Sequence, residues 1–254
     1  MRFLKMILLL GGLLVSSPWL LLAGASVDFA PPNQYIEIND NDLFDVGASE
    51  SFTICMWVNI DSIKSDGQYT RIIDKYSTLG WTFDCSDPGS SSIRMTLFLN
   101  DGVDSALARA STTITASTWT FLCATYDNTL NSTLGISLFK NGVEVSYLTR
   151  NSTNLIDSMS NTTKVYIGVL SDITGDYDGR MAYVHMYKRV LTLTEINQIM
   201  IKPGSITDSL VGYWPLWGVN SPEIDLSGNG NTGTVTGATS SSDGPPIMLS
   251  SGGH

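Results

Sequence analysis

The sequence predicts an all-β fold, a sandwich or barrel of short antiparallel strands, with one short helix. Stretches that alternate apolar and polar residues recur along the chain between turns rich in Gly, Asn, Asp and Ser. Only one stretch has the residue spacing of an amphipathic helix. Because strands and helices do not alternate, units of strand, helix and parallel strand are not expected.

The stretch SFTICMWVNI at 51–60 illustrates the alternation of apolar and polar residues by which the strands are predicted. Its alternation places Phe52, Met56 and Ile60 on one face, which is predicted to be core, and Cys55 and Trp57 on the other. The same reading gives strands, in chain order, at 35–38, 51–60, 70–76, 80–85, 92–100, 119–127, 134–142, 143–148, 164–170 and 180–190.

Two local signals fix a turn and the helix. Asn141-Gly142, within FKNGVEV, supplies the two positive-φ positions of a tight hairpin turn. In TLTEINQIM at 192–200, Thr192 and Glu195 have the spacing of a capping box, and Pro203 ends the segment. The sequence therefore predicts a hairpin centred on 141–142 and a helix that begins after Thr192.

The two ends of the chain are predicted to lie outside the folded domain. Residues 1–25 combine Arg2 and Lys5, an apolar run and a small-residue site ending at Ala25, which is typical of a signal peptide. The alternative is an N-terminal membrane anchor. One domain is then expected over 26–238, followed by a flexible Ser/Gly/Pro-rich tail at 239–254. Either interpretation places the domain in an oxidising space: secreted, anchored and facing outside, or on a virion surface.

The charge balance restricts the partners. A formal net charge of −10 argues against nucleic acids and anionic membranes, which bind clustered Lys and Arg. Positive ions and neutral sugars are the easier ligands.

The order of the motifs resembles a known family. FTICMWV, FLCATYD, FKNGVEV, YIG, GRMAYVHMYKRVLTLTEINQI and GYWPL are similar, in this order, to the pentraxin and laminin G-like branch of the concanavalin A-like lectin/glucanase superfamily, over residues 27–236. The resemblance implies a jelly roll of two antiparallel sheets with the helix packed at one edge. It also implies a Cys55–Cys123 disulfide, since pentraxins bridge the matching strands. Cys85 is then either a free thiol or a site of intermolecular pairing.

The family's calcium ligands are only partly present. The pentraxin double calcium site has no counterpart in YSTLGW or GVLSD, and Ala182 stands where laminin G-like domains often have an acidic residue. A reduced site for one Ca²⁺ could use the carboxylates of Asp172, Asp176 and Asp178 in one short loop. The alternative is a polar turn between strands.

Catalysis is not expected. EIDLSGNG at Glu223 resembles the start of a glycosidase signature of this fold, but Gly228 stands where the second carboxylate is needed. Only two histidines exist, so neither a Ser-His-Asp site nor a His-based zinc site can be assembled.

Two binding functions remain. The first is a lectin-like module in which Trp57, Trp81 and Trp119 stack on sugar faces, the alternative for each being core packing. Its partner would be a glycan or a cell-surface or extracellular protein. The second is a structural surface or appendage subunit that associates with copies of itself.

Three sequons are candidate glycosylation sites, at Asn131, Asn151 and Asn161. In a eukaryotic host they would be modified, whereas in a bacterium they would be products of an Asn-, Ser- and Thr-rich composition. The sequence does not choose between these hosts.

Overall fold

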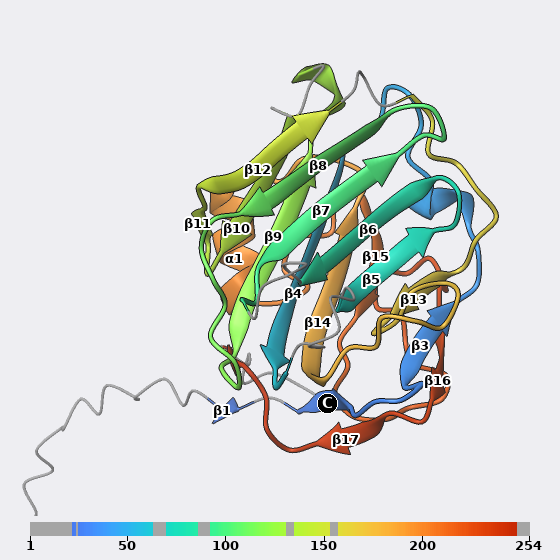
Figure 1. Cartoon of the computed structure of the whole chain (residues 1–254). Coiled ribbons are helices and arrows are strands. Elements are labelled where there is room, and N and C mark those ends of the chain that lie inside the picture. Colours follow the sequence, from blue (N-terminus) through green and yellow to red (C-terminus); the bar gives the residue numbers. More distant parts are fainter. Residues whose placement is uncertain are drawn as a thin grey trace, which may run out of the picture.

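The protein is a sandwich of two antiparallel β-sheets, seen in a computed structural model that describes residues 22–23, 25–62, 70–85, 92–130, 135–152 and 157–247 (Figure 1). Within these residues each large sheet has eight strands. This confirms the all-β jelly-roll prediction with one short helix.

The front sheet is the one whose outer face is not covered by the helix. Its strands, in spatial order, are β12 (Tyr147–Ser152), β8 (Ser105–Ala110), β7 (Met95–Asn100), β6 (Gly80–Cys85), β5 (Arg71–Tyr76), β13 (Val165–Ile167), β3 (Tyr35–Ile38) and β16 (Gly233–Thr236).

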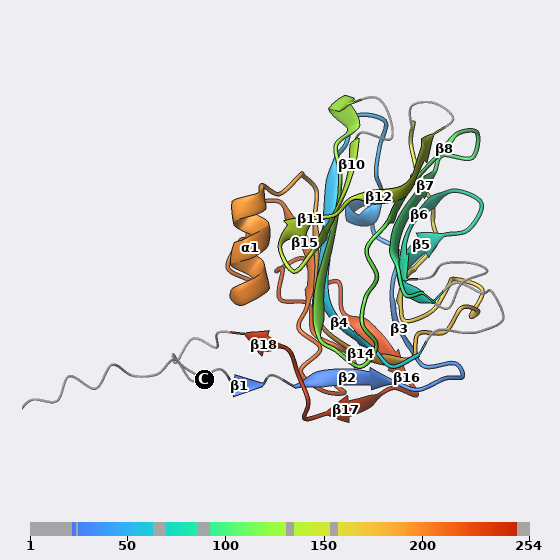
Figure 2. The same cartoon turned by 60° about the vertical axis from the view of Figure 1, so that its left-hand side comes forward.

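The back sheet lies behind it and carries the helix α1 (Leu193–Ile201) on its outer face (Figure 2). Its strands, in spatial order, are β11 (Val143–Glu144), β10 (Ile136–Lys140), β9 (Thr120–Tyr126), β4 (Phe52–Ile60), β14 (Gly179–Tyr187), β2 (Ser26–Phe29) and β17 (Thr239–Ser241), with β15 (Leu210–Trp214) also paired to β14. A two-stranded pair, β1 (Leu22–Ala23) and β18 (Pro246–Ile247), and the 3-10 turns η1 (Asp42–Phe44) and η2 (Asn128–Leu130) complete the described elements.

The main core lies between the sheets and is built from the inward face of each alternating strand. Phe52, Trp81 and Trp214 are fully buried there. All nine residues of β4 are buried, because its second face is covered as well. A second apolar cluster, which includes Trp57, Phe121, Ile196 and Ile199, fills the space between the back sheet and α1.

The helix begins and ends as predicted. Thr192 accepts from the Glu195 backbone N–H and the Glu195 side chain returns to the Thr192 backbone, which is the reciprocal capping box. Ile196 and Ile199 point into the second cluster, and burying each contributes roughly 2 kcal/mol. The hairpin is also present, with positive φ at Asn141 and Gly142 between β10 and β11. In the part of the chain described here, no helix has the length and apolar character needed to cross a bilayer.

Several elements differ from the predictions. The predicted flexible tail from residue 239 is corrected, because Thr239–Ser241 pairs with β2 and Pro246–Ile247 pairs with β1. The described residues leave out only 248–254 of that tail. They also leave out most of the predicted signal peptide or anchor, namely residues 1–21 and 24. The predicted strand at 143–148 is split between β11 and the beginning of β12. Strand β8, like β2 and β15–β18, is absent from the predicted strands. The sequence of β8, SALARA, lacks the β-branched and aromatic residues that mark strands.

Candidate functional site

The two outer faces of the sandwich differ in accessibility. The helix α1 lies against the outer face of the back sheet (Figure 2). The front sheet presents partly exposed side chains on β7, β8 and β12. Since successive side chains of a strand point to opposite faces, the residues that alternate with the core positions form this surface. The outer face of the front sheet is therefore the place where a ligand can reach the sandwich.

A single row of cross-strand neighbours runs over that face. The register pairs Asn151 with Leu107, Leu107 with Phe98, and Phe98 with Thr82, and it continues through Asp74, Tyr166, Glu37 and Thr234. The row begins with an amide and two apolar side chains and continues into hydroxyl and carboxylate groups. Thr82 and Asp74, in the middle of the row, are buried, so only the two ends of the row are open to a ligand.

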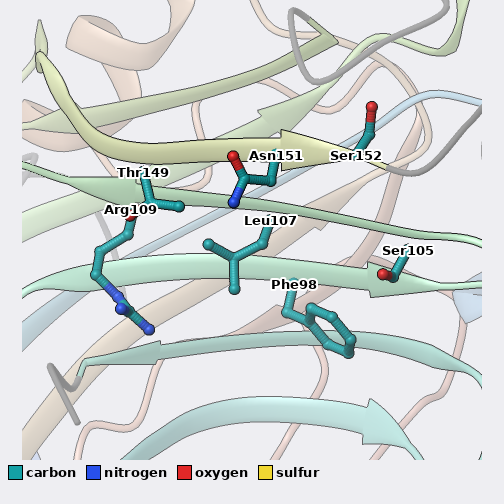
Figure 3. Close-up of a pocket in the computed structure, with 7 residues that line it drawn as sticks. All are labelled: Phe98, Ser105, Leu107, Arg109, Thr149, Asn151 and Ser152. Atoms are coloured by element: carbon teal, nitrogen blue, oxygen red, sulfur yellow. The ribbon is translucent and has the colours of Figure 1, made fainter.

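A pocket of about 340 Å³ opens at the first end of this row (Figure 3). Its volume lies at the low end of the range of about 300–1,000 Å³ that small-molecule sites have. Leu107 forms the middle of the pocket, with the Phe98 ring on one side and the Asn151 amide on the other (Figure 3). Seven residues line it: Phe98, Ser105, Leu107, Arg109, Thr149, Asn151 and Ser152.

The apolar and polar walls of the pocket are held by neighbouring strands. The ring of Tyr76 packs edge-on against Phe98, with 5.7 Å between ring centroids, and so limits the movement of Phe98. The Arg109 Nε donates to Thr96 Oγ1 at 3.2 Å, which fixes part of the guanidinium over β7, the strand that also carries Phe98. The pocket thus combines one aromatic face with guanidinium, amide and hydroxyl groups.

Two buried carboxylates lie on β5 and β6, the strands that follow β7 across the front sheet. Asp84 forms a 2.8 Å ion pair with Arg71. Asp74 is fully buried, and burial raises its pKa to about 7, although its Oδ2 accepts from the backbone N–H groups of Tyr76 and Ser171. Asp74 is therefore bonded within the sheet and is not exposed to a ligand.

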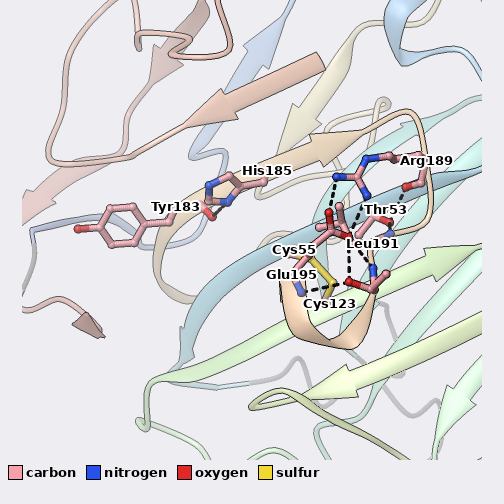
Figure 4. The surroundings of a disulfide bond; sticks show 9 residues. Thr53, Cys55, Cys123, Tyr183, His185, Arg189, Leu191 and Glu195 are labelled. Carbon is pink, nitrogen blue, oxygen red and sulfur yellow. Dashed lines mark hydrogen bonds and ion pairs between the residues drawn. A yellow bond between two sulfur atoms is a disulfide. The ribbon is translucent and has the colours of Figure 1, made fainter. Parts of the chain in front are cut away.

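The predicted cysteine pair is joined. Cys55 and Cys123 are directly opposite one another on β4 and β9 and form a disulfide between the back sheet and α1 (Figure 4). Cys85 is free and fully buried on β6. Because Cys85 is buried, its thiol is out of reach of a second folded chain, and burial also raises its pKa well above the usual value.

The three predicted stacking tryptophans do not lie together. Trp81 is fully buried in the main core and its Nε1 donates to the Phe44 carbonyl, so the stacking expectation is corrected for this residue. Trp57 is 6% exposed and donates to the Met200 carbonyl beneath α1, so its ring is also covered. Trp119 is partly buried, and its Nε1 lies 3.2 Å from Asp243 Oδ2. None of the three is among the residues that line the pocket.

The three aspartates proposed for calcium are bonded to different groups. Asp172 accepts from the backbone and hydroxyl of Thr174, and Asp176 accepts from the backbone N–H of Asn33. Asp178 accepts from the Ser62 hydroxyl. Among the described residues, no group of three or more His, Cys, Asp or Glu side chains is arranged to hold a metal ion.

Glu223 lies inside the protein. Its side chain is fully buried and its Oε1 accepts from the Leu216 backbone N–H at 3.0 Å, while its Oε2 has no hydrogen-bond partner among the residues that the structure describes. Burial raises its pKa to about 7. A substrate on the surface cannot reach this carboxylate.

No motif in the sequence marks the pocket residues as a group. The signal that could have found them is Phe98, because in the stretch MTLFLN it is a large apolar residue on the face that alternates with the core. The other pocket residues are ordinary polar side chains whose convergence depends on the register of three strands.

Comparisons with known proteins agree with the architecture. The family described as the concanavalin A-like lectin/glucanases superfamily (Laminin_G_3) matches residues 31–197. No curated protein sequence matches the chain.

Three solved structures illustrate the structural similarity. A candidate carbohydrate-binding protein from Bacteroides ovatus has a TM-score of 0.69 at 18% identity, over 89% of this chain and 62% of its own. A heptameric pentraxin from Limulus polyphemus has a TM-score of 0.55 at 10% identity, over 85% and 96%. The binding domain of botulinum neurotoxin serotype G has a TM-score of 0.52 at 14% identity, over 69% and 42%. The chain thus spans less than two thirds of the Bacteroides protein, and at these identities the likeness concerns the fold.

Proposed function

The chain belongs to the concanavalin A-like lectin/glucanases superfamily, and from this premise we propose that it is a non-catalytic extracellular module that binds carbohydrate on the outer face of its front sheet. The observation that carries the proposal is the pocket beside Phe98 on the uncovered face of the sandwich. The Bacteroides ovatus structure, described as a candidate carbohydrate-binding protein, supports the same class of ligand by analogy of fold.

The chemistry of the pocket suits a sugar ring. The apolar face of a pyranose packs on an aromatic ring such as Phe98, while its hydroxyl groups need donors and acceptors. Asn151, Thr149 and Ser105 supply amide and hydroxyl groups around the same space. A pocket of about 340 Å³ favours recognition of one or two sugar residues over a long polymer groove.

A non-catalytic role is supported by the position of Glu223. Retaining glycosidases need two carboxyl groups roughly 5 Å apart at the substrate. Glu223 is fully buried, and the residue that the signature would make its partner is Gly228. An extracellular location is supported by the disulfide, since disulfides persist in oxidising compartments.

A glycan array followed by calorimetry tests the binding proposal. We expect Phe98→Ala to weaken binding of a selected sugar about tenfold, as loss of an aromatic stacking contact does. Thr234→Ala is the matched control, because Thr234 is exposed at the other end of the same cross-strand row. If wild type and Phe98→Ala bind the sugar equally, the sugar binds elsewhere on the protein. If the protein releases reducing ends in proportion to its concentration, and Glu223→Gln abolishes this release, the protein is an enzyme.

Self-association is a second candidate function, favoured by one surface feature. Within 217–226, four large apolar side chains are 38–45% exposed: Trp217, Val219, Ile224 and Leu226. Exposed apolar side chains that gather in one patch are typical of contact surfaces between proteins, and these four lie close together in the sequence. If the array is silent, light scattering should find an oligomer that Trp217→Ser dissociates, whereas a monomer at all concentrations argues against this function.

A further inference from the structure

One of the three sequons lies at the pocket. Asn151 begins the sequence Asn151-Ser152-Thr153, is exposed on β12, and is paired with Leu107 of β8. Asn151 and Ser152 both line the pocket, and the Asn151 amide is directed toward Leu107 (Figure 3). A group attached to this amide would therefore extend over the pocket.

The sequon at Asn161 is in the opposite situation. The Asn161 Nδ2 donates to the carbonyl oxygens of Lys75, Leu79 and Met159 at 3.2–3.3 Å, and its Oδ1 accepts from the Thr163 backbone at 2.8 Å. A Cβ added at Gly80 would lie only 2.9 Å from this nitrogen. The nitrogen that would carry a sugar is thus surrounded by three acceptors and by backbone.

We propose that Asn151 is an N-glycosylation site whose attached sugar covers the pocket, and that Asn161 is a structural residue which the native protein carries unmodified. In the modification, the Asn151 Nδ2 bonds to the anomeric carbon of a glycosyl diphosphate donor. The carbon–oxygen bond to the phosphate breaks, the phosphate keeps the electron pair, and the amide nitrogen releases one proton. The third sequon, at Asn131, lies outside the described residues.

The energetic difference between the two sites supports the assignment. At Asn151 the new bond replaces contact with solvent, because the side chain is exposed. At Asn161 the new bond would remove hydrogen bonds that the Asn161 amide donates to backbone carbonyls, including the one that links the loop at 157–163 to β5. A carbonyl that is buried without a donor destabilises the fold, because it has lost its contact with water and gained no other partner. A chain modified at Asn161 would not reach the present fold.

The consequence is that modification controls access to the pocket. An effect of this glycosylation on sugar binding rests on the proposed function. The glycosylation of Asn151 and the covering of the pocket by the attached sugar do not. Both can be measured with a thiol placed in the pocket, because Cys85 is buried and Cys55 is bonded to Cys123.

The experiment uses the full chain expressed in a secretory host that performs N-glycosylation. Peptide mass mapping of the folded protein should find Asn151 occupied and Asn161 unoccupied. The thiol of Leu107→Cys should react with a maleimide at least tenfold faster when Thr153→Ala removes the sequon and keeps the Asn151 side chain. Val103→Cys is the control, since Val103 is 91% exposed in the turn between β7 and β8, and its rate should change less than twofold.

Three results would overturn the proposal: an unoccupied Asn151, a folded protein modified at Asn161, or equal maleimide rates for Leu107→Cys with and without the sugar. The glycosylation proposal and the proposed sugar-binding function are tested separately by measuring sugar binding to the Thr153→Ala protein, which carries no sugar at Asn151. The sugar for this calorimetry is first selected by its binding to that unmodified protein. Absence of sugar binding by that protein counts against the proposed function alone.

Discussion

Buried charged residues are the feature that most distinguishes this protein at the scale of single residues. Lys75 is fully buried, and its Nζ is surrounded by Asp40 Oδ1 at 2.6 Å, Asp45 Oδ1 at 3.2 Å and the carbonyl oxygens of Asn161 and Thr163 at 2.8 and 2.9 Å. Glu223 lacks such compensation, since one of its oxygens has no partner within the described part of the chain. Lys75 is therefore a structural link, and Glu223 a residue that lowers stability when it ionises.

Replacing Glu223 by Gln should remove a pH-dependent loss of stability. The pKa of Glu223 rises from 4.5 to about 7 on folding. Below pH 4.5 the carboxyl is protonated in both states, but between pH 4.5 and 7 the unfolded chain ionises while the folded chain keeps its proton. The free energy of unfolding therefore falls as the pH rises through this window.

We expect Glu223→Gln to match wild type near pH 4 and to be more stable by roughly 1–3 kcal/mol at about pH 8. Urea unfolding at both pH values measures this difference. Asp74, whose pKa also rises to about 7, contributes equally to both proteins and cancels. A pH-independent difference between the two proteins would show that Glu223 does not titrate in this window.

Replacing Lys75 by Met should be strongly destabilising. The change keeps the length of the side chain but leaves Asp40 and Asp45 without their shared cation, and breaking a buried ion pair costs about 3–5 kcal/mol. Thermal or urea unfolding measures the loss. Lys164→Met is the control, because Lys164 pairs with Glu37 at the surface and its loss should have little effect. Equal effects of both substitutions would refute the structural role of Lys75.

At the scale of elements, polar side chains of a loop take the place of a neighbouring strand along one edge of β15. The free edge of β15 is satisfied by the loop 225–231: Asp225 accepts from the Tyr213 backbone N–H, and the Asn229 and Asn231 amides donate to the Val211 carbonyl. Polar side chains thus close an edge that would otherwise be open to pairing with other strands. The helix α1 similarly covers the disulfide face of the back sheet.

The disulfide between β4 and β9 should stabilise the protein mainly by restricting the unfolded chain. It closes a loop with a sequence separation of 68, for which the loss of chain entropy predicts an upper limit of about 4 kcal/mol. We expect Cys55→Ala/Cys123→Ala to lose about 2–4 kcal/mol and to show a larger dependence of unfolding on urea concentration.

The matched control is Cys85→Ala, which removes a buried sulfur without removing a cross-link. It should leave the urea dependence unchanged. Non-reducing peptide mapping should find Cys55 linked to Cys123 and a single thiol that reacts only after denaturation. A peptide linking Cys85 to either of the other cysteines would contradict this assignment.

At the scale of the whole molecule, the net charge of −10 favours cations without providing a defined site for one among the described residues. We expect calcium binding, measured by calorimetry, to be weak and limited to one site, because Asp172, Asp176 and Asp178 are bonded to separate groups. Asp176→Asn and Asp178→Asn should reduce it, and Asp208→Asn is a control at an exposed acidic residue. Two tightly bound ions per chain would refute the expectation.

The sequence by itself determined the fold class, the core-facing side of the strand at 51–60, the hairpin at 141–142 and the capped helix. Each depends on local periodicity or on residues a few positions apart, as with Thr192 and Glu195. The Cys55–Cys123 pair was found through resemblance to a family, since spacing alone cannot choose between three cysteines.

The tertiary structure alone decided which residues form the pocket and which tryptophans are accessible. Phe98, Leu107 and Asn151 become neighbours only through the register of β7, β8 and β12, and a shift of one residue would turn them to the other face. Trp81 and the sequon at Asn161 could not be judged from the sequence, because the residues that bury Trp81 and the Lys75 carbonyl to which the Asn161 amide donates lie in segments distant in the chain. The local periodicity of the residues determines whether a segment forms a strand or a helix. Packing between distant segments determines which side chains are exposed and what they can bind.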